Sequence, residues 1–115
     1  MSQKAEMEDY VRKELDALER MVLNWKGNHL GFATPDGNND FLVEEFQEEI
    51  TTYMSPYLRR LYQCEYITLQ EAEEFMNWCY DQVDDLRRLI QELETPPMKP
   101  GFLQRLIGRT KQVWR

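Results

Sequence analysis

Acidic side chains recur at helical spacing in two stretches of the sequence, and paired carboxylates of this kind can bind a metal ion or transfer a proton. Residues four apart lie on one face of a helix, and three pairs have this spacing: Glu44/Glu48, Glu45/Glu49 and Asp81/Asp85. A di-iron bundle needs a Glu-x-x-His motif on two helices, whereas the chain has a single histidine, His29. An all-carboxylate magnesium or manganese site would need two acidic faces to converge. Acidic runs on helices are far more often solvated faces, so we predict no metal site.

A calcium-type loop is suggested by the segment Asp36 to Asp40, which has oxygen ligands at positions one, three and five. The pattern then fails, because position six is Phe41 instead of glycine and position twelve is Gln47 instead of glutamate. A turn followed by the start of a helix explains the same residues, and we favour that interpretation.

Nucleophilic catalysis has no motif to support it. We expect His29 in a loop, and no motif places a serine, a cysteine or a carboxylate beside it. Cys64 and Cys79, with one histidine in the chain, match none of the common zinc spacings, so we expect two reduced and partly buried thiols. A disulfide would form only in an exported protein. No glycine-rich phosphate-binding motif is present. The sequence therefore predicts a protein that is not an enzyme and that binds no cofactor.

Charge is divided sharply along the chain. All 21 acidic residues lie at or before Glu94, whereas five of the 14 basic residues follow Thr95. The formal charge is therefore −12 up to Glu94 and +5 from Thr95 onward. Such a division indicates that the two parts meet different surroundings, or that they meet each other.

The basic segment, residues 101–115, can form a short amphipathic helix. The residues that we expect to bind a partner or a membrane are apolar on one side (Phe102, Leu103, Leu106, Ile107 and Trp114) and basic elsewhere (Arg105, Arg109 and Lys111). Gly108 weakens this helix by about 1 kcal/mol relative to alanine, and a helix this short is marginal in water alone. It therefore needs a surface to fold against.

Three surfaces could hold this helix. The first is an acidic groove on the chain's own body, where the segment would dock as a fourth helix. The second is a membrane surface that carries anionic lipid, and the third is a groove on a partner protein. A nucleic acid is disfavoured, because the body of charge −12 would be repelled and no DNA- or RNA-binding motif is present.

The first of three expected long helices runs from about Gln3 to Lys26. Gly27 is predicted to end it, and Asn28 to Asn39 is predicted to be a loop. The apolar face of this helix has a 4,3,4,3 spacing over Val11, Leu15, Leu18, Val22 and Trp25.

The second helix is expected to begin near Asp40, whose side chain can cap it. Pro56 disturbs this helix, because proline lacks a backbone donor and clashes with the preceding turn. The helix either kinks at Pro56 or breaks and restarts with Ser55 as its cap, and the sequence leaves both open. The predicted apolar face is Val43, Phe46, Ile50, Tyr53, Tyr57 and Leu61.

The third helix opens with a capping box formed by Thr68 and Glu71, and Thr95-Pro96-Pro97 is expected to end it. Its apolar face keeps a regular alternation of three- and four-residue steps: Leu69, Ala72, Met76, Cys79, Val83, Leu86, Ile90 and Leu93. Trp78 and Tyr80 lie off this face. They either widen the core or form a patch for self-association, so a homodimer through this helix is one hypothesis.

Together these elements predict an all-α protein: an antiparallel three-helix bundle, with its second helix kinked or broken at Pro56, plus a short amphipathic C-terminal helix. Residues 1–95 would form the acidic bundle, and residues 96–115 a proline-rich linker and the basic helix. The 115 residues, 42% hydrophobic and 30% charged, are typical of one globular domain. We expect a cytoplasmic protein, because no segment could span a bilayer and no signal peptide is recognisable.

Our leading functional hypothesis is a non-enzymatic protein-interaction module: an adaptor, a regulator or a small chaperone-like partner. It would use the basic C-terminal helix and the aromatic helix faces, and the sequence does not identify its protein partner. The alternative is a peripheral membrane-associated protein attached through the C-terminal helix. A weaker hypothesis is an acidic mimic of nucleic acid, against which the basic segment counts.

Overall fold

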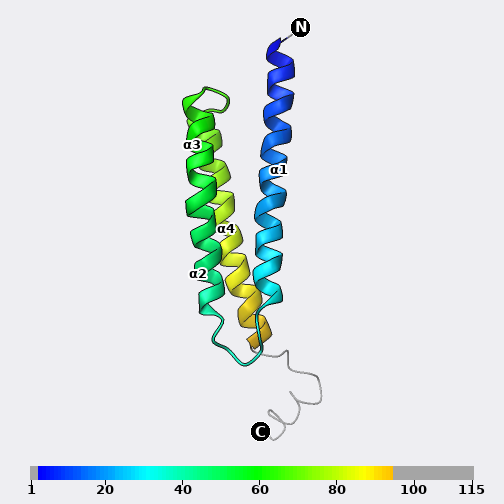
Figure 1. The fold of residues 1–115 in the computed structure, drawn as a ribbon, viewed down its shortest axis with the longest axis vertical. Helices are drawn as coiled ribbons and strands as arrows, with labels where there is room; N and C mark the ends of the chain where they lie inside the picture. The colour runs from blue at the N-terminus through cyan, green and yellow to red at the C-terminus, as the bar shows by residue number, and fades with distance from the viewer. Residues whose placement is uncertain (1–2, 95–115) are drawn as a thin grey trace, which may run out of the picture.

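The computed structural model describes residues 3–94, and this part of the chain is helical throughout apart from two short connections and contains no strand. The helices are α1 (Gln3–Gly31), α2 (Asp40–Glu49), a π-helical turn (Ile50–Met54), α3 (Ser55–Gln63) and α4 (Leu69–Glu94). Figure 1 shows that α2, the π-turn and α3 form one rod, so residues 3–94 make three rods. The all-α prediction is confirmed for these residues, whereas the predicted C-terminal helix lies outside them.

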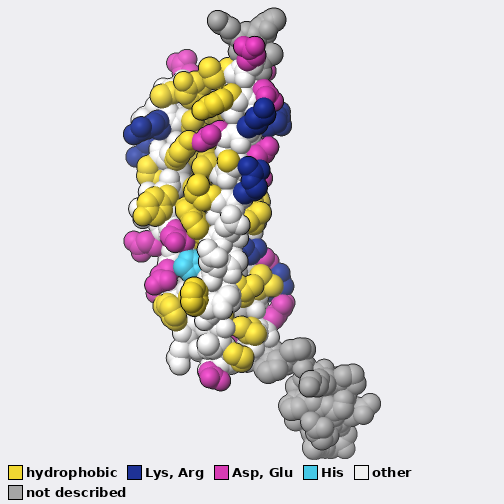
Figure 2. Space-filling model, turned by 45° about the vertical axis from the view of Figure 1, so that its right-hand side comes forward, with side chains coloured by type: hydrophobic (Ala, Val, Ile, Leu, Met, Phe, Trp, Pro, Cys, Tyr) yellow, Lys and Arg dark blue, Asp and Glu magenta, His cyan; other side chains and the backbone are white. Residues whose placement is uncertain are grey.

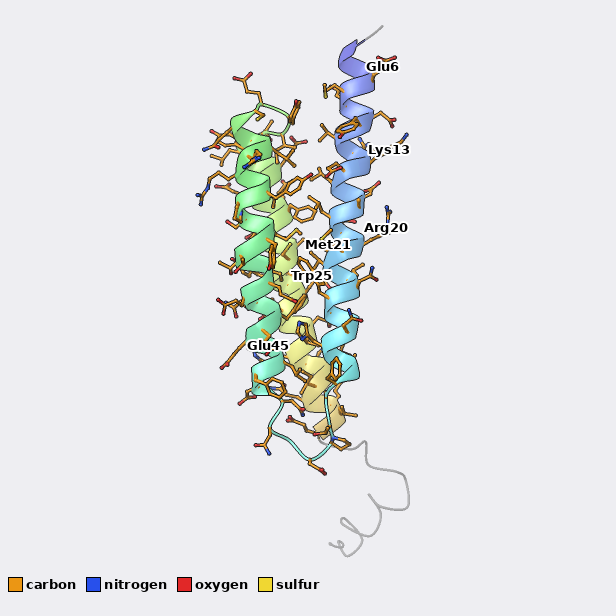
Figure 3. The ribbon with its side chains drawn as sticks, viewed as in Figure 1. Glu6, Lys13, Arg20, Met21, Trp25 and Glu45 are labelled. Carbon is orange, nitrogen blue, oxygen red and sulfur yellow. The ribbon has the colours of Figure 1, made fainter. Side chains whose placement is uncertain are left out.

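α1 is longer than predicted. It continues through Gly27 to Gly31, so the predicted end at Gly27 is wrong. A glycine inside a helix costs about 1 kcal/mol relative to alanine. The added turn offsets this cost, because Leu30 packs against the core and His29 contacts α2. Figure 3 shows Lys13 and Arg20 pointing away from the other rods, whereas Trp25 lies on the side of α1 that faces them.

The core is made by one face of each rod. In α1 the predicted face is confirmed: Val11, Leu18 and Val22 are buried, and Leu15 and Trp25 pack against them. In α4 the predicted face is buried over its middle, at Ala72, Cys79, Val83, Leu86 and Ile90, with Phe75 in addition. Its two ends, Leu69 and Leu93, are exposed.

The second rod departs from the predicted face at the π-turn. Met54 and Leu58 are each 1% exposed, whereas the predicted core residue Tyr53 is 59% exposed. A π-turn bonds residue i to residue i+5 and so contains one residue more than an α-turn. The backbone N–H of Ser55 accordingly donates to the carbonyl of Ile50. The extra residue rotates every later side chain, which moves the buried face from Tyr53 and Tyr57 to Met54 and Leu58.

The π-turn also decides between the two alternatives left open at Pro56, a kink in the helix or a break and restart. The rod is continuous, and Ser55 has α-helical angles (φ −60°, ψ −49°), so the helix does not break and restart at a cap. In a regular α-helix the proline ring would clash with the carbonyl four residues earlier, at Thr52. That carbonyl lies inside the π-turn, and we attribute the tolerance of Pro56 to this wider turn.

The connection between α1 and α2 is held by Asn39, which is only 2% exposed. Its side-chain oxygen accepts the N–H of Thr34 (3.0 Å), and its side-chain nitrogen donates to the Thr34 carbonyl (2.7 Å) and to Glu94 (2.7 Å). α2 begins at Asp40 as predicted, but Asn39 and not Asp40 occupies the capping position, without a capping side-chain bond. The segment Asp36 to Asp40 is thus a turn followed by the start of a helix, the interpretation that the sequence favours, and its buried Asn39 side chain binds other residues of the chain.

The start of α4 agrees with the sequence in detail. The N–H of Glu71 donates to the Thr68 hydroxyl (3.0 Å), and the N–H of Thr68 donates to the Glu71 carboxylate (2.8 Å). This reciprocal pair is the predicted capping box. None of the helices between residues 3 and 94 is both long enough and apolar enough to cross a membrane.

Candidate functional site

A cleft opens between the first half of α1 and the connection from α3 to α4. Figure 1 shows α1 standing apart from α3 at this end of the molecule, and the residues that line the cleft come from all three rods. Its volume is about 870 Å³. Val11, Leu15, Ile67 and Phe75 provide its apolar floor, and Glu8 and Glu19 lie on its α1 side. We call this the α1–α4 cleft.

The rim of the α1–α4 cleft is acidic. Besides Glu8 and Glu19, the carboxylates of Asp16, Glu65 and Glu71 line it, and Arg12 is its one basic residue. Five carboxylates against one guanidinium give this rim a formal charge of −4. An apolar floor inside an acidic rim favours a ligand that is apolar on one side and basic at its edges.

A second cleft lies on the other side of Val11, between α1 and α3, and has a volume of about 740 Å³. Met7 and Tyr10 on α1 are 45% and 66% exposed at its mouth. Leu61 and Tyr66 line it from the other rod and the following connection. We call it the α1–α3 cleft. Figure 2 shows hydrophobic side chains reaching the surface over much of this side of the molecule, with charged side chains at its margins.

The connection between the two clefts has an unusual backbone. The N–H of Tyr66 donates to the carbonyl of Leu61 and the N–H of Glu65 to the carbonyl of Tyr62, both at 2.9 Å. These two bonds form a Schellman motif, in which the residue at the Glu65 position is left-handed and is usually glycine. Glu65 has φ +65°, a conformation that costs a side-chain-bearing residue about 1–2 kcal/mol. A strained acidic residue therefore stands on the rim of the α1–α4 cleft.

Tyr57 bridges the α1–α3 cleft because the π-turn has rotated it out of the core. Its hydroxyl donates a hydrogen bond to the carboxylate of Glu14 on α1. This bond, with burial and the charge of Glu14 adding to it, raises the pKa of Tyr57 to about 12. The phenol consequently remains a neutral donor up to strongly alkaline pH, and it ties α3 to α1 across the cleft.

His29 lies in the last turn of α1 and not in a loop, which corrects the sequence-based expectation. Its Nε2 is 2.9 Å from Glu49, its Nδ1 is 4.0 Å from Glu45, and its ring packs on Phe46 with centroids 5.9 Å apart. The sequence could not reveal this pairing, because it depends on how α1 meets α2. Within the part of the chain that is described, no group of three or more His, Cys, Asp or Glu side chains is arranged to hold a metal ion.

Lys26 joins α1 to α4 lower in the bundle. Its ammonium donates to Gln82 (2.8 Å) and to the carboxylate of Asp85, which also accepts from Arg88 (3.2 Å). These bonds, that of Lys26 first, lower the pKa of Asp85. The side chain of Lys26 is largely enclosed, so its charge is matched where the rods pack closely. This network fixes α1 on α4 below the cleft.

The two cysteines differ in accessibility. Cys64 is exposed at the end of α3, beside the cleft-lining residues Tyr62 and Glu65, whereas Cys79 is fully buried. Burial raises the pKa of the Cys79 thiol to about 12, which keeps it protonated and unreactive.

The sequence-predicted site residues are distributed as follows. The apolar and basic set of the C-terminal helix (Phe102, Leu103, Arg105, Leu106, Ile107, Arg109, Lys111 and Trp114) lies outside the described residues. Trp78 packs against the core and against Phe75, at a centroid separation of 5.6 Å, whereas Tyr80 is exposed. Residues two apart on a helix do not share a face, so the two do not form one patch. Self-association through them stays a prediction.

Sequence reasoning missed the two clefts. Met7, Tyr10 and Tyr66 carried no spacing signal, because a cleft depends on where α1 leaves its neighbours and not on the pattern of one helix. One sequence signal pointed to this region: Glu65 occupies the position just after the end of a helix, where glycine is the usual residue.

No protein-family model matches the chain, and neither a curated protein nor a solved structure matches it. Its function must therefore be inferred from its own residues and their geometry.

Proposed function

We propose that this chain is a non-enzymatic protein-interaction module, an adaptor or regulator, that binds a basic amphipathic helix in the α1–α4 cleft. The observation that carries the proposal is the form of that cleft: an apolar floor of Val11, Leu15, Ile67 and Phe75 inside a rim of charge −4. An amphipathic helix presents apolar residues at i, i+3, i+4 and i+7 along one face. Its basic flanks would then meet the acidic rim.

The strained conformation of Glu65 supports this role. Glycine would relieve the left-handed strain, yet the position holds a carboxylate on the cleft rim. Residues kept in costly backbone conformations gather at functional sites, where the surrounding structure holds them. A residue that destabilises the backbone but places a negative charge on the cleft rim is expected in a binding surface.

Cys79 and His29 are both engaged within the bundle, which supports a binding role over catalysis. Cys79 is buried with a raised pKa, and the ring of His29 is occupied by Glu49 and Phe46. Both arrangements stabilise the bundle and leave neither side chain poised over a cleft.

We further propose that residues 1–95 act as an antiparallel three-helix scaffold, to which residues 101–115 append a helix. We place the module in the cytoplasm, where an exposed thiol such as that of Cys64 stays reduced.

A defined probe tests the proposed function: a synthetic leucine–lysine helix, titrated into the full-length protein and followed by calorimetry. The paired change Glu8→Lys and Glu19→Lys reverses two charges on the cleft wall. Exposed ion pairs contribute up to about 1 kcal/mol each, so we expect the affinity to fall on the order of tenfold. The matched control, Glu48→Lys with Asp81→Lys, makes the same change in net charge at exposed positions outside both clefts.

Two results would contradict the proposal. One is equal weakening by the control pair, which would show attraction to net charge alone. The other is equal binding of a leucine–glutamate helix of the same length.

Glu65→Gly provides a second test. We expect this variant to be more stable, by about 1 kcal/mol, and to bind the leucine–lysine helix more weakly. Denaturation in urea and the same titration measure the two effects, and a gain in stability with unchanged affinity would remove Glu65 from the site.

A further inference from the structure

We propose that the α1–α4 cleft is occupied by residues 101–115 of the same chain, so that a protein partner must displace them. This inference rests on the proposed function, because it names the segment that fills the same cleft. It turns an open binding surface into a regulated one.

Charge complementarity is the first argument. The rim of the α1–α4 cleft has a formal charge of −4, whereas the chain from Thr95 onward has a charge of +5. The apolar residues Leu103, Leu106 and Ile107 have the 3,4-type spacing that places them on one helix face. The segment therefore has the chemistry that the cleft favours: apolar on one side and basic beside it.

The reach of the chain is the second argument. α4 ends its described part at Glu94, and Glu71, the cleft residue nearest its start, lies 23 residues earlier, or about 35 Å along the helix. An extended proline-rich linker over residues 95–100 spans about 19 Å at about 3.1 Å per residue. A helix over residues 101–115 adds about 22 Å. If the segment lies back along the bundle, its length is therefore sufficient to reach the level of the cleft.

The short linker also favours the same chain over a separate partner. A short tether gives the attached segment an effective concentration in the millimolar range. A free partner helix of equal intrinsic affinity must reach that concentration to compete. Displacement consequently requires a tighter or a multivalent partner.

Cys64 makes the proposal testable in the full-length protein. It is exposed beside the cleft, whereas Cys79 is fully buried, so a nitroxide reagent will label Cys64 selectively. Glu94 lies about 39 Å away at the other end of α4. If residues 101–115 occupy the cleft, the label will broaden their amide signals in the NMR spectrum. If they stay near the far end of α4, their signals will keep full intensity, and the proposal fails.

A mixture separates the two possible sources of the segment. Spin-labelled protein without ¹⁵N is mixed with ¹⁵N protein without the label. Same-chain occupancy leaves the mixture unbroadened, whereas broadening in the mixture would show that a second copy supplies the segment and would overturn the proposal. Charge reversal by Glu8→Lys with Glu19→Lys should weaken the same-chain broadening, and Glu48→Lys with Asp81→Lys should preserve it.

The failures of the two proposals are distinguishable. In one outcome the leucine–lysine helix binds the cleft while the NMR signals of residues 101–115 are not broadened. That outcome would support the proposed function and refute occupancy of the cleft by the chain itself. In another outcome no broadening is seen, and the full-length protein floats with anionic vesicles but not with neutral ones. That outcome would assign the segment to a membrane surface and refute occupancy of the cleft.

Discussion

Replacing Leu58 by alanine should destabilise the protein far more than replacing Tyr53, although the sequence pattern placed Tyr53 in the core. Leu58 is 1% exposed, so its truncation leaves a cavity beneath α4. Leucine-to-alanine changes at such sites cost about 2–5 kcal/mol. Tyr53 is mostly exposed and loses chiefly its contact with Trp25, at a centroid separation of 6.0 Å, which corresponds to about 1 kcal/mol.

Urea denaturation followed by circular dichroism measures this difference. With a slope of about 1–3 kcal/mol per molar urea, a loss of about 3 kcal/mol lowers the midpoint of Leu58→Ala by about 1–3 M. Leu23→Ala, at an exposed position on α1, serves as the matched leucine control and should shift the midpoint little. A larger loss for Tyr53→Ala than for Leu58→Ala would mean that the second rod is a regular α-helix, and the π-turn would be refuted.

Three further predictions concern single side chains. Thr68→Ala removes half of the capping box and should lower the unfolding free energy by about 1 kcal/mol in urea denaturation. Because the pKa of Tyr57 is raised to about 12, its hydrogen bond to Glu14 contributes its full stabilisation up to pH 10, the ordinary pKa of tyrosine. This stabilisation is lost as the pH rises from 10 toward 12. The stability difference between the protein and Tyr57→Phe should therefore be constant between about pH 7 and pH 10 and shrink above pH 10; a difference that stays constant above pH 10 would exclude this bond as the cause. A thiol reagent should modify Cys64 in the native protein and Cys79 only after unfolding, as mass spectrometry will show.

Features that depend on neighbours in the sequence were predicted well. The Thr68–Glu71 capping box forms as expected, because both of its bonds join residues three apart. The apolar faces of α1 and α4 were also predictable, since a single helical period runs through each of them. Local spacing determines the capping box and most of the two faces, although Leu69 and Leu93 at the ends of the α4 face are exposed and Phe75 is buried in addition.

Features that depend on tertiary packing were not predicted. α1 passes Gly27 because Leu30 and His29 gain partners on other elements, and those partners are invisible to local propensity. The tyrosines of the second rod were assigned to the core on the assumption of an uninterrupted α-helical period. The two clefts could not be predicted from the sequence, because they arise where α1 and the other rods separate.

The π-turn has a consequence for insertions and deletions. The buried positions of the second rod, Val43, Phe46, Ile50, Met54 and Leu58, follow steps of 3, 4, 4 and 4. Removing one exposed threonine, Thr51 or Thr52, converts the steps to 3, 4, 3 and 4, which is a regular α-helical period. A one-residue deletion in mid-helix normally turns half of the helix away from its core, yet here it preserves every buried side chain, provided that Pro56 is also replaced. Sequence alignments that include this chain should accordingly permit a single-residue gap within residues 50–54.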